Sequence, residues 1–394
     1  MPSTAQRHPT LFQTYGERSD QSGLTPLATY LLRLIHYKRT NLCVSADVNT
    51  TTELLRLAED VGDHICVLKT HADIIDDFSD KTIRGLNEIS KRKKFLVFED
   101  RKFGDIGSTL QQQYTRGPLA IVRWAQIVNA ALFPGPAIIT ALAEAAQKAI
   151  VAHNTSVQTD ISASPAASVV DSTRDDESVQ ETDEEDAGAT PIAVDSDIEE
   201  EDGDDDRKGR KQSVVSVSTT ISTKTEAISP QPTLRPVLPR RASGEESDDL
   251  DEDEDLDKEL AELGTPPFYR SLLLLAQMSS EGNLFTSEYT QQCVTHAREN
   301  KDFVMGFIAQ QTLNTEPKDN FITMTPGVQL SAGGDGLGQQ YNTPWKVIGE
   351  GGSDIIIVGR GILKAEDRRR TALEYRKQGW IAYQERVRSG RKKR

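Results

Sequence analysis

Short apolar runs recur along the chain and are separated by longer segments with helical periodicity. Val, Ile, Leu and Phe dominate these runs, and most are apolar at consecutive positions, which is typical of strands covered on both faces. Eight runs predict strands over Leu42–Asp47, Ile65–Lys69, Phe95–Asp100, Ala125–Asn129, Leu272–Gln277, Phe303–Ala309, Phe321–Thr325 and Ile355–Gly359.

Helix-like segments lie between most of these runs. They cover Thr52–Val61, Asp77–Arg92, Pro136–Val151 and Glu288–Asn300. A chain that alternates strand and helix favours a parallel sheet with right-handed crossovers. Eight such units favour a closed (β/α)8 TIM barrel over an open doubly wound sheet, and a TIM barrel has its functional site at the carboxyl ends of the strands.

One long segment interrupts this alternation. Residues 151–260 contain no Phe, Tyr, Trp or Cys, and they carry 31 acidic and 10 basic residues, a net charge of −21. The rest of the chain carries 30 acidic and 36 basic residues, so the overall net charge of −15 comes from this segment. Because so charged a segment buries too little apolar surface to offset the entropy of ordering, we expect it to be disordered.

We therefore expect a barrel in two parts, residues 1–150 and 263–388, with an acidic disordered insertion at 151–262 and a basic tail at 389–394. The insertion precedes the fifth strand and so lies at the N-terminal end of the barrel, opposite the predicted site. Long surface insertions cost little closure entropy. We expect this one to be catalytically neutral.

The insertion and the tail carry motifs that point to partners. Arg240–Ser243 and Ser247–Asp249 resemble sites that a kinase or another partner recognises, and phosphate there would add negative charge. The alternative is unselected linker sequence. The basic residues Arg388–Arg394 are interpreted as a frayed, solvated end, with a nuclear signal as the alternative.

Polar residues follow most of the predicted strands. Any one of them could be a helix cap or a turn residue, but together at one rim they predict a site. They are Asp47, Lys69 with His71 and Asp73, Asp100 with Lys102, Ser279–Ser280, Gln310–Gln311, Pro326–Gly327, and Gly359–Arg360–Gly361.

The densest charge pattern follows the third strand, where Asp100, Lys102 and Asp105 lie within six positions. Side chains two apart on a strand share a face, so Asp100 and Lys102 are predicted to point the same way. Asp105 lies just past the strand end, where the chain can fold it back toward that pair. A solvated charge cluster is the alternative interpretation.

With these motifs in place, the chain resembles the fungal type of the orotidine 5′-phosphate decarboxylase family. The likeness covers nearly all of residues 10–150 and 265–388. It is carried by residues 42–47, 68–73, 98–109, 278–280, 324–328, 337–341 and 353–361. The Asp-x-Lys-x-x-Asp element also occurs in a sister family that decarboxylates a sugar-phosphate keto acid, but the Gln-Gln-Tyr and Thr-Pro-Gly-Val segments favour the pyrimidine enzyme.

The resemblance implies the last step of de novo UMP synthesis, in which CO2 leaves a pyrimidine carboxylate without metal or cofactor. Lys102 would stabilise and then protonate a carbanion at ring carbon C6. Asp100 would lie beside the departing carboxylate, and Lys69 and Asp105 would complete an array of alternating charges. In the family the residue that matches Asp105 comes from the other subunit, so the resemblance also implies a homodimer with shared sites.

The same resemblance implies the substrate contacts. Arg360, Gln339 and Tyr341 would hold the phosphate, the last two next to a Gly-rich segment, Ser331–Gly338, that is expected to be a mobile lid. Ser279 would contact the pyrimidine amide, and a lone His71 is interpreted as a supporting residue. The full set of implied substrate-binding residues is Asp47, Lys69, Thr109, Ser279, Pro326, Gln339, Tyr341, Gly359 and Arg360.

Other features narrow the classes of function. Cys43, Cys66 and Cys293 show no metal-ligand spacing, so neither zinc nor a disulfide is predicted. The apolar run Leu272–Ala276 is too short to cross a bilayer, and the expected compartment is the cytosol. Two rival functions stay open: another phosphate-binding barrel lyase of the same superfamily, and a catalytically retired barrel whose acidic insertion binds partners.

Overall fold

A computed structural model of the chain describes residues 7–155, 258–331, 333–334 and 340–391. Eight parallel strands close into a barrel in the order β1-β10-β7-β6-β5-β4-β3-β2. The barrel strands are β1 Leu42–Ala46, β2 Val67–Thr70, β3 Leu96–Phe103, β4 Ile127–Ala130, β5 Ser271–Leu275, β6 Val304–Ile308, β7 Ile322–Thr325 and β10 Ile355–Val358. Each strand begins within two residues of the start of a predicted strand, so the (β/α)8 prediction is confirmed.

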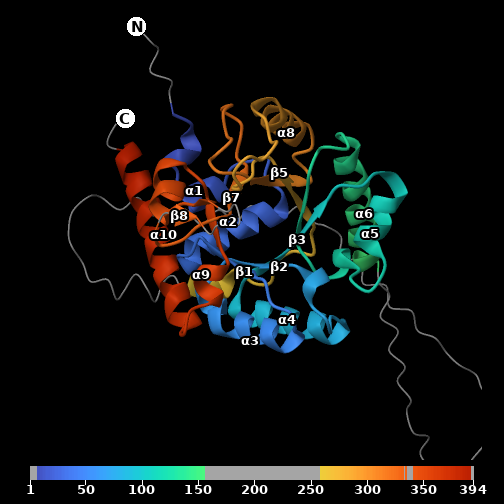
Figure 1. Cartoon of the computed structure of the whole chain (residues 1–394). Coiled ribbons are helices and arrows are strands. Elements are labelled where there is room, and N and C mark those ends of the chain that lie inside the picture. Colours follow the sequence, from blue (N-terminus) through green and yellow to red (C-terminus); the bar gives the residue numbers. More distant parts are fainter. Residues whose placement is uncertain (1–6, 156–257, 332, 335–339, 392–394) are drawn as a thin grey trace, which may run out of the picture. The chain divides into compact units, whose positions relative to one another are not determined.

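Helices surround the strands (Figure 1). The α-helices are α1 Tyr15–Ser19, α2 Pro26–Lys38, α3 Thr51–Val61, α4 Asp80–Lys93, α5 Gly107–Thr115, α6 Ala137–Asn154, α8 Ser287–Glu299, α9 Arg360–Leu363 and α10 Arg368–Arg391. Single turns occur at η1 Pro9–Leu11, η2 Gly62–His64, η3 Ala72–Ile74, η4 Ile121–Arg123 and η5 Trp345–Glu350, and β8 Gly333–Gly334 pairs with β9 Gln340–Tyr341 in an antiparallel hairpin.

Local sequence explains where these elements begin. Thr25 caps α2 by accepting a hydrogen bond from the Ala28 amide, and Pro26 supplies a preset φ at the first helical position. Thr50 caps α3 in the same way. The strands are buried throughout most of their length, as expected for a sheet with side chains filling one face and helices covering the other.

Most of the insertion predicted at residues 151–262 lies outside the described part of the chain, so its disorder stays a prediction. Its predicted ends do not match the described residues, because α6 continues to Asn154 and residues 258–262 are helical. A ring stack joins the described chain on either side of the insertion. In the last turn of α6, the His153 ring stacks on Phe268 with 3.6 Å between ring centroids, and the Arg270 guanidinium lies 4.1 Å from the same ring. The two segments that flank the insertion are therefore adjacent at the start of β5.

A buried lysine fastens the same, N-terminal end of the barrel. Lys38, at the end of α2, donates hydrogen bonds to four backbone carbonyls at 2.6–2.8 Å, those of Gly62, Ile65, Lys93 and Lys94. These carbonyls lie at or just after the C-terminal ends of α3 and α4, so one side chain ties three helices to the starts of β2 and β3. Burial lowers the pKa of Lys38 to about 7, and the buried group is tolerated because all its donors are satisfied.

Replacing Lys38 by Met should lower the free energy of unfolding by about 2–4 kcal/mol, because four buried carbonyls lose their donor. Denaturant unfolding of the purified full chain measures this change. The control is Lys91→Met on the exposed face of α4, which should shift the free energy of unfolding by less than about 0.5 kcal/mol. An unfolding midpoint that Lys38→Met leaves unchanged would contradict the role given to this lysine.

Candidate active site

A cavity of 220 Å³ opens at the carboxyl ends of the barrel strands. It is where the polar strand ends were predicted to meet, and most of them do. The lining residues are Ser45, Asp47, Lys69, Phe98, Asp100, Lys102, Leu275, Met278, Ser279, Ile308, Pro326, Gly327, Val328, Tyr341, Ile357, Gly359, Arg360 and Gly361. Charged groups from β1, β2 and β3 therefore share one cavity with Arg360, which follows β10.

Asp100 is the centre of this charge cluster, with a side chain that is 12% exposed. Its Oδ2 accepts a hydrogen bond from Lys69 Nζ at 2.8 Å, and its Oδ1 lies 2.8 Å from Lys102 Nζ. Burial of the carboxyl opposes its ionisation, but the charges of Lys69 and Lys102 and a hydrogen bond from His71 outweigh burial. Together they hold the pKa of Asp100 far below its usual range.

His71 belongs to the cluster more closely than its sequence position indicated. Its Nδ1 lies 2.8 Å from Asp47 Oδ1, and its Nε2 lies 3.2 Å from Asp100 Oδ2. Burial lowers the pKa of His71, but the hydrogen bonds to Asp100 and Asp47 outweigh it, so the pKa is raised. A ring with a carboxylate at each nitrogen is suited to the imidazolium form.

Asp47 completes this side of the cavity. Its Oδ1 accepts a hydrogen bond from Ser45 Oγ at 2.8 Å and faces Lys69 Nζ at 3.9 Å. Burial by itself raises the pKa of Asp47. The hydrogen bond from His71 and the charge of Lys69 outweigh burial and lower the pKa to about 2. The carboxylate is therefore ionised and able to accept hydrogen bonds at neutral pH.

Asn129 was not singled out from the sequence, although it ends a predicted strand and is buried. Its Nδ2 donates to Asp100 Oδ1 at 2.7 Å, and its Oδ1 accepts from the Lys102 backbone amide at 2.7 Å. One amide thus fixes both the carboxylate and the backbone that carries the lysine. Its place at the carboxyl end of β4 was the available signal.

The backbone of β3 differs from the regular strand that the sequence predicted. Lys102 has a φ of 51°, in the left-handed region, and the pairing of β3 with β4 shifts register between Glu99 and Phe103. Asp100 and Lys102 meet as expected, but a bulge brings them together instead of simple alternation. A non-glycine residue at positive φ is uncommon and is held here by the Asn129 hydrogen bond.

Glu99 is fully buried behind the cluster. Its Oε2 accepts a hydrogen bond from Thr70 Oγ1 at 2.7 Å, and both carboxylate oxygens accept from the Ala72 amide. Burial raises the pKa of Glu99 to about 7, against the effect of these hydrogen bonds. The contacts fix the chain on either side of His71, which holds that ring between its two carboxylates.

The opposite end of the cavity is basic and lies after β10. The Arg360 guanidinium lies 5.5 Å from the centroid of the Tyr341 ring, and the planar fork of a guanidinium matches the geometry of a phosphate. Gly359 precedes it, and a Cβ at this position would lie 3.4 Å from Asp47 Oδ2 and from Ser45 Cβ. A glycine therefore keeps room at the junction between the acidic and basic ends.

Two of the predicted site residues do not reach the cavity within this chain, and a third lies outside the described residues. Asp105 does not fold back toward Lys102. Its carboxylate instead accepts hydrogen bonds from the Ile106 backbone amide and from Gln113 Nε2, the latter at 2.9 Å. Thr109 is exposed on α5. Gln339, like most of the predicted lid, is among the residues that are not described.

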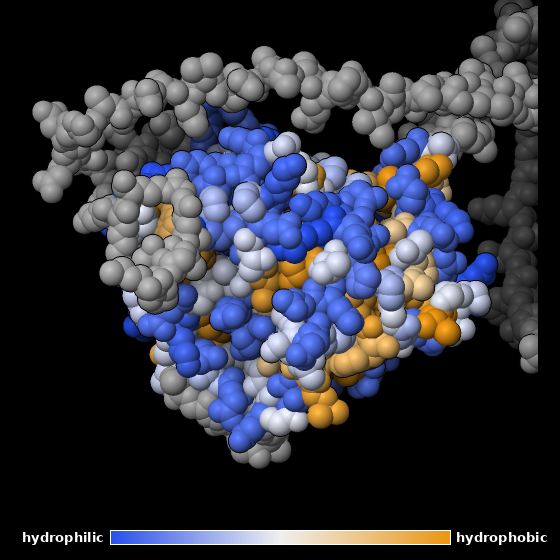
Figure 2. Space-filling model, turned by 90° about the horizontal axis from the view of Figure 1, so that it is seen from above, coloured by the Kyte–Doolittle hydropathy of each residue, from blue (hydrophilic) through white to orange (hydrophobic). Residues whose placement is uncertain are grey.

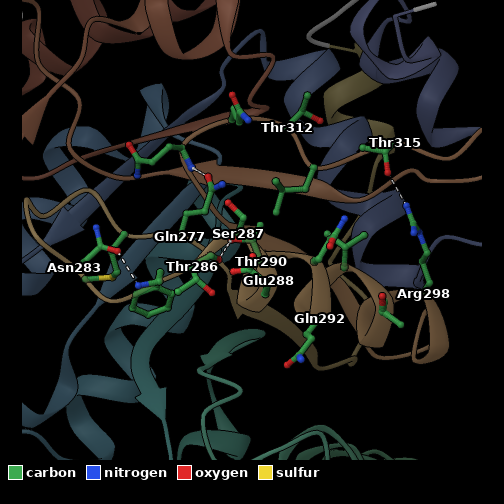
Figure 3. Close-up of a pocket in the computed structure, with 18 residues that line it drawn as sticks. Gln277, Asn283, Thr286, Ser287, Glu288, Thr290, Gln292, Arg298, Thr312 and Thr315 are labelled. Carbon is green, nitrogen blue, oxygen red and sulfur yellow. Dashed lines mark hydrogen bonds between the residues drawn. The ribbon is translucent and has the colours of Figure 1, made fainter. Parts of the chain in front are cut away.

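A larger hollow of 1010 Å³ lies along α8 and the loops after β5 and β6 (Figure 3). Amide and hydroxyl side chains dominate it, including Gln277, Thr286 and Gln292. Its cation, Arg298, points to Thr315 and pairs with Asp319 at 2.7 Å. Because the acid and base groups gather in the smaller cavity, we assign the chemistry to that cavity.

The described residues hold neither a membrane-spanning helix nor a metal-binding cluster. None of the helices seen there is long and apolar enough to cross a membrane. Over the same residues, no group of three or more His, Cys, Asp and Glu side chains is arranged to hold a metal ion.

Comparison with known proteins places this site in context. The model of the orotidine 5′-phosphate decarboxylase / HUMPS family matches residues 40–375. The orotidine 5′-phosphate decarboxylase of Aureobasidium pullulans is 46% identical over 378 residues, which cover 96% of each chain. That of Hypocrea jecorina is 45% identical over 400 residues, covering 96% of this chain and 99% of the relative.

Among solved structures, orotidine 5′-monophosphate decarboxylase from Methanocaldococcus jannaschii aligns with 13% identity and a TM-score of 0.42, covering 86% of this chain and 98% of the other. The family match and the near full-length relatives decide the assignment. The chain belongs to the orotidine 5′-phosphate decarboxylase / HUMPS family.

Proposed function

We propose that the chain decarboxylates orotidine 5′-monophosphate to uridine 5′-monophosphate (UMP) and CO2. The observation that carries the proposal is the Asp100 carboxylate, held between Lys69 and Lys102 at 2.8 Å each in a cavity whose other end carries Arg360. The relatives named above bear the name of this activity. A substrate with a phosphate at one end and a carboxylate at the other matches the two ends of the cavity.

The substrate is oriented by groups at both ends of the cavity. Arg360 and Tyr341 bind the phosphate, and Gln339 is proposed to join them. Asp47 and Lys69 bind the ribose hydroxyls, and Ser279 accepts and donates at the pyrimidine amide. Pro326 and Gly359 form walls of the same cavity. This binding places ring carbon C6 and its carboxylate beside Lys102 and Asp100.

In the chemical step the bond between C6 and the carboxylate carbon breaks, and its electron pair stays on C6 while CO2 leaves. The Lys102 ammonium stabilises this carbanion and donates a proton to C6, and the amine regains a proton from water. At an effective dielectric near 20, two unit charges 4 Å apart interact by about 4 kcal/mol, whereas enzymes lower barriers by roughly 8–23 kcal/mol. The preorganised array as a whole, and not one pair, supplies the stabilisation.

We further propose that the enzyme is a homodimer whose partner supplies Asp105 and Thr109 to this cavity. Both residues lie outside the cavity of their own chain, on the segment that follows β3. Large apolar side chains are exposed on the loops after β3, β4 and β5: Ile106 is 60% exposed, Phe133 62% and Leu284 86%. Figure 2 shows orange, apolar patches among polar residues on the face seen from above. Exposed apolar patches favour a protein interface.

Replacing Lys102 by Ala should lower turnover by at least about a thousandfold, because both carbanion stabilisation and the proton donor are lost. The loss of orotidine 5′-monophosphate absorbance with pure protein measures it. Lys91→Ala, a substitution of an exposed lysine on α4, is the control. Equal rates for Lys102→Ala and the unsubstituted chain would end the proposed mechanism, and turnover of a sugar-phosphate keto acid instead would favour the rival lyase.

Mixing two inactive variants tests the shared site. Lys102→Ala and Asp105→Ala each damage every site of their own homodimer, but a mixed dimer keeps one intact site. Random reassembly of equal amounts should recover about one quarter of the native activity. Activity that stays at the level of the separate variants, in a mixture that has exchanged subunits, would show that Asp105 acts in its own chain or not at all.

The raised pKa of His71 makes a prediction about pH. Because its imidazolium persists above the ordinary histidine pKa of about 6.5, its charge is lost as the pH rises through the raised value. We expect kcat/KM to fall over that range and the fall to be absent in His71→Asn. NMR titration of the ring gives the pKa directly, with His296→Asn as the surface control. A His71 pKa at or below the ordinary value would refute the assignment.

A further inference from the structure

A tyrosine of α8, Tyr289, bridges two strand ends beside the candidate active site. The parallel ladder between β4 and β5 ends at the pair Ala130 and Leu274. Just past this pair, the Tyr289 hydroxyl accepts a hydrogen bond from the Leu132 amide at 2.8 Å and donates one to the Leu275 carbonyl at 3.0 Å. One side chain therefore adds a further link between the two strands at their carboxyl ends.

Packing and burial fix this hydroxyl in place. The Tyr289 ring stacks on Phe133 with 4.8 Å between ring centroids, and Phe285 meets it edge-on at 5.0 Å. Burial raises the pKa of the Tyr289 hydroxyl, so the group keeps its proton at neutral pH. A protonated hydroxyl can donate and accept at once, which is what a bridge between a carbonyl and an amide needs.

The next residue of α8 holds the same strand end. Thr290 Oγ1 donates to the Ala276 carbonyl at 3.0 Å, and Gln277 Oε1 accepts from the Gln310 amide at 2.9 Å. Thr290 and Gln277 both line the hollow along α8 (Figure 3). Three consecutive residues, from the last of β5 onward, are thus each held from outside the strand. Two residues further along the chain, Ser279 lines the catalytic cavity.

The other side of the bridge leads to the charged groups of the site. Leu132 lies three residues after Asn129, whose side chain accepts a hydrogen bond from the Lys102 amide. Tyr289 therefore lies between the segment that is tied to Lys102 and the segment that carries Ser279. Past the end of the ladder between β4 and β5, a side-chain bridge of this kind sets how far apart the two segments lie.

We infer that Tyr289 is a positioning residue, whose hydroxyl sets the place of Ser279 relative to Lys102. Tyr289 does not occur among the described residues that line the catalytic cavity, so it acts through the segments that it joins. The inference rests on the proposed function, in which Ser279 contacts the pyrimidine amide and Lys102 the reacting carbon. It assigns Tyr289 to the base end of the substrate and not to the phosphate end at Arg360.

Inhibition of turnover by two ligands tests the inference. UMP carries the base, whereas ribose 5-phosphate keeps only the sugar and the phosphate. Tyr289→Phe should raise the inhibition constant of UMP about three- to tenfold and that of ribose 5-phosphate less than about twofold, since only the base meets the displaced segment.

Tyr269→Phe is the matched control. The Tyr269 hydroxyl also donates to a backbone carbonyl, that of Asp302 at 2.5 Å, but it lies next to the start of β5, at the opposite end of the strand. Its loss should leave both inhibition constants unchanged. If Tyr289→Phe does not fold, Thr290→Val carries the test with the same expected result, because it removes the neighbouring hydrogen bond to the same strand end.

The outcomes are distinguishable. A purely structural role would raise both constants equally, because a loosened barrel end loses its hold on every part of the ligand. That equal rise, or an unchanged constant for UMP, overturns the inference and leaves the proposed function standing. Failure of the unsubstituted chain to turn over orotidine 5′-monophosphate contradicts the proposed function itself, and the inference with it.

Discussion

The candidate site depends on one buried carboxylate. Asp100 lies within 3.2 Å of groups from three other residues that are cationic or can become so, Lys69, His71 and Lys102. Without this carboxylate the three would face one another across the cavity, where like charges repel. With it, each cation has a fixed partner and a fixed direction. The array therefore exists before substrate arrives, and little reorganisation remains for the chemical step.

The barrel holds this carboxylate through its neighbours on both sides. The register of β2 with β3 sets Lys69 beside Phe98 and Thr70 beside Glu99, so the second strand presents its lysine next to Asp100. On the other side, Asn129 of β4 bonds to the carboxylate and to the amide of Lys102. Behind the cluster, buried Glu99 fixes the turn that carries His71. The left-handed backbone at Lys102 is thus held by contacts with strands that flank it, as strained residues in sites commonly are.

Much of this could be predicted from the sequence, because apolar runs and polar strand ends are local signals. The eight strands and the meeting of Asp47, Lys69, Asp100, Lys102 and Arg360 follow from the pattern and from the geometry of a parallel barrel. The bulge at Lys102 could not be predicted, since it arises from a register shift against another strand. Asn129 and His71 gain their importance only from partners on neighbouring strands. Asp105 illustrates a different limit: within this chain its carboxylate is bonded to the Ile106 amide and to Gln113, and its proposed place beside Lys102 rests on resemblance and not on any local signal of the sequence.

The two ends of the barrel divide stability from chemistry. At the N-terminal end, Lys38 satisfies four carbonyls and the His153–Phe268 stack joins the two segments that flank residues 156–257. A segment whose ends are already held together adds only the slowly growing entropy of a longer loop. The charges of the site lie at the other end, after the strands, where Asp100 holds Lys69 and Lys102 at 2.8 Å each. The balance of ions at the site is therefore set, residue by residue, by contacts that share no side chain with those that close the barrel at its N-terminal end.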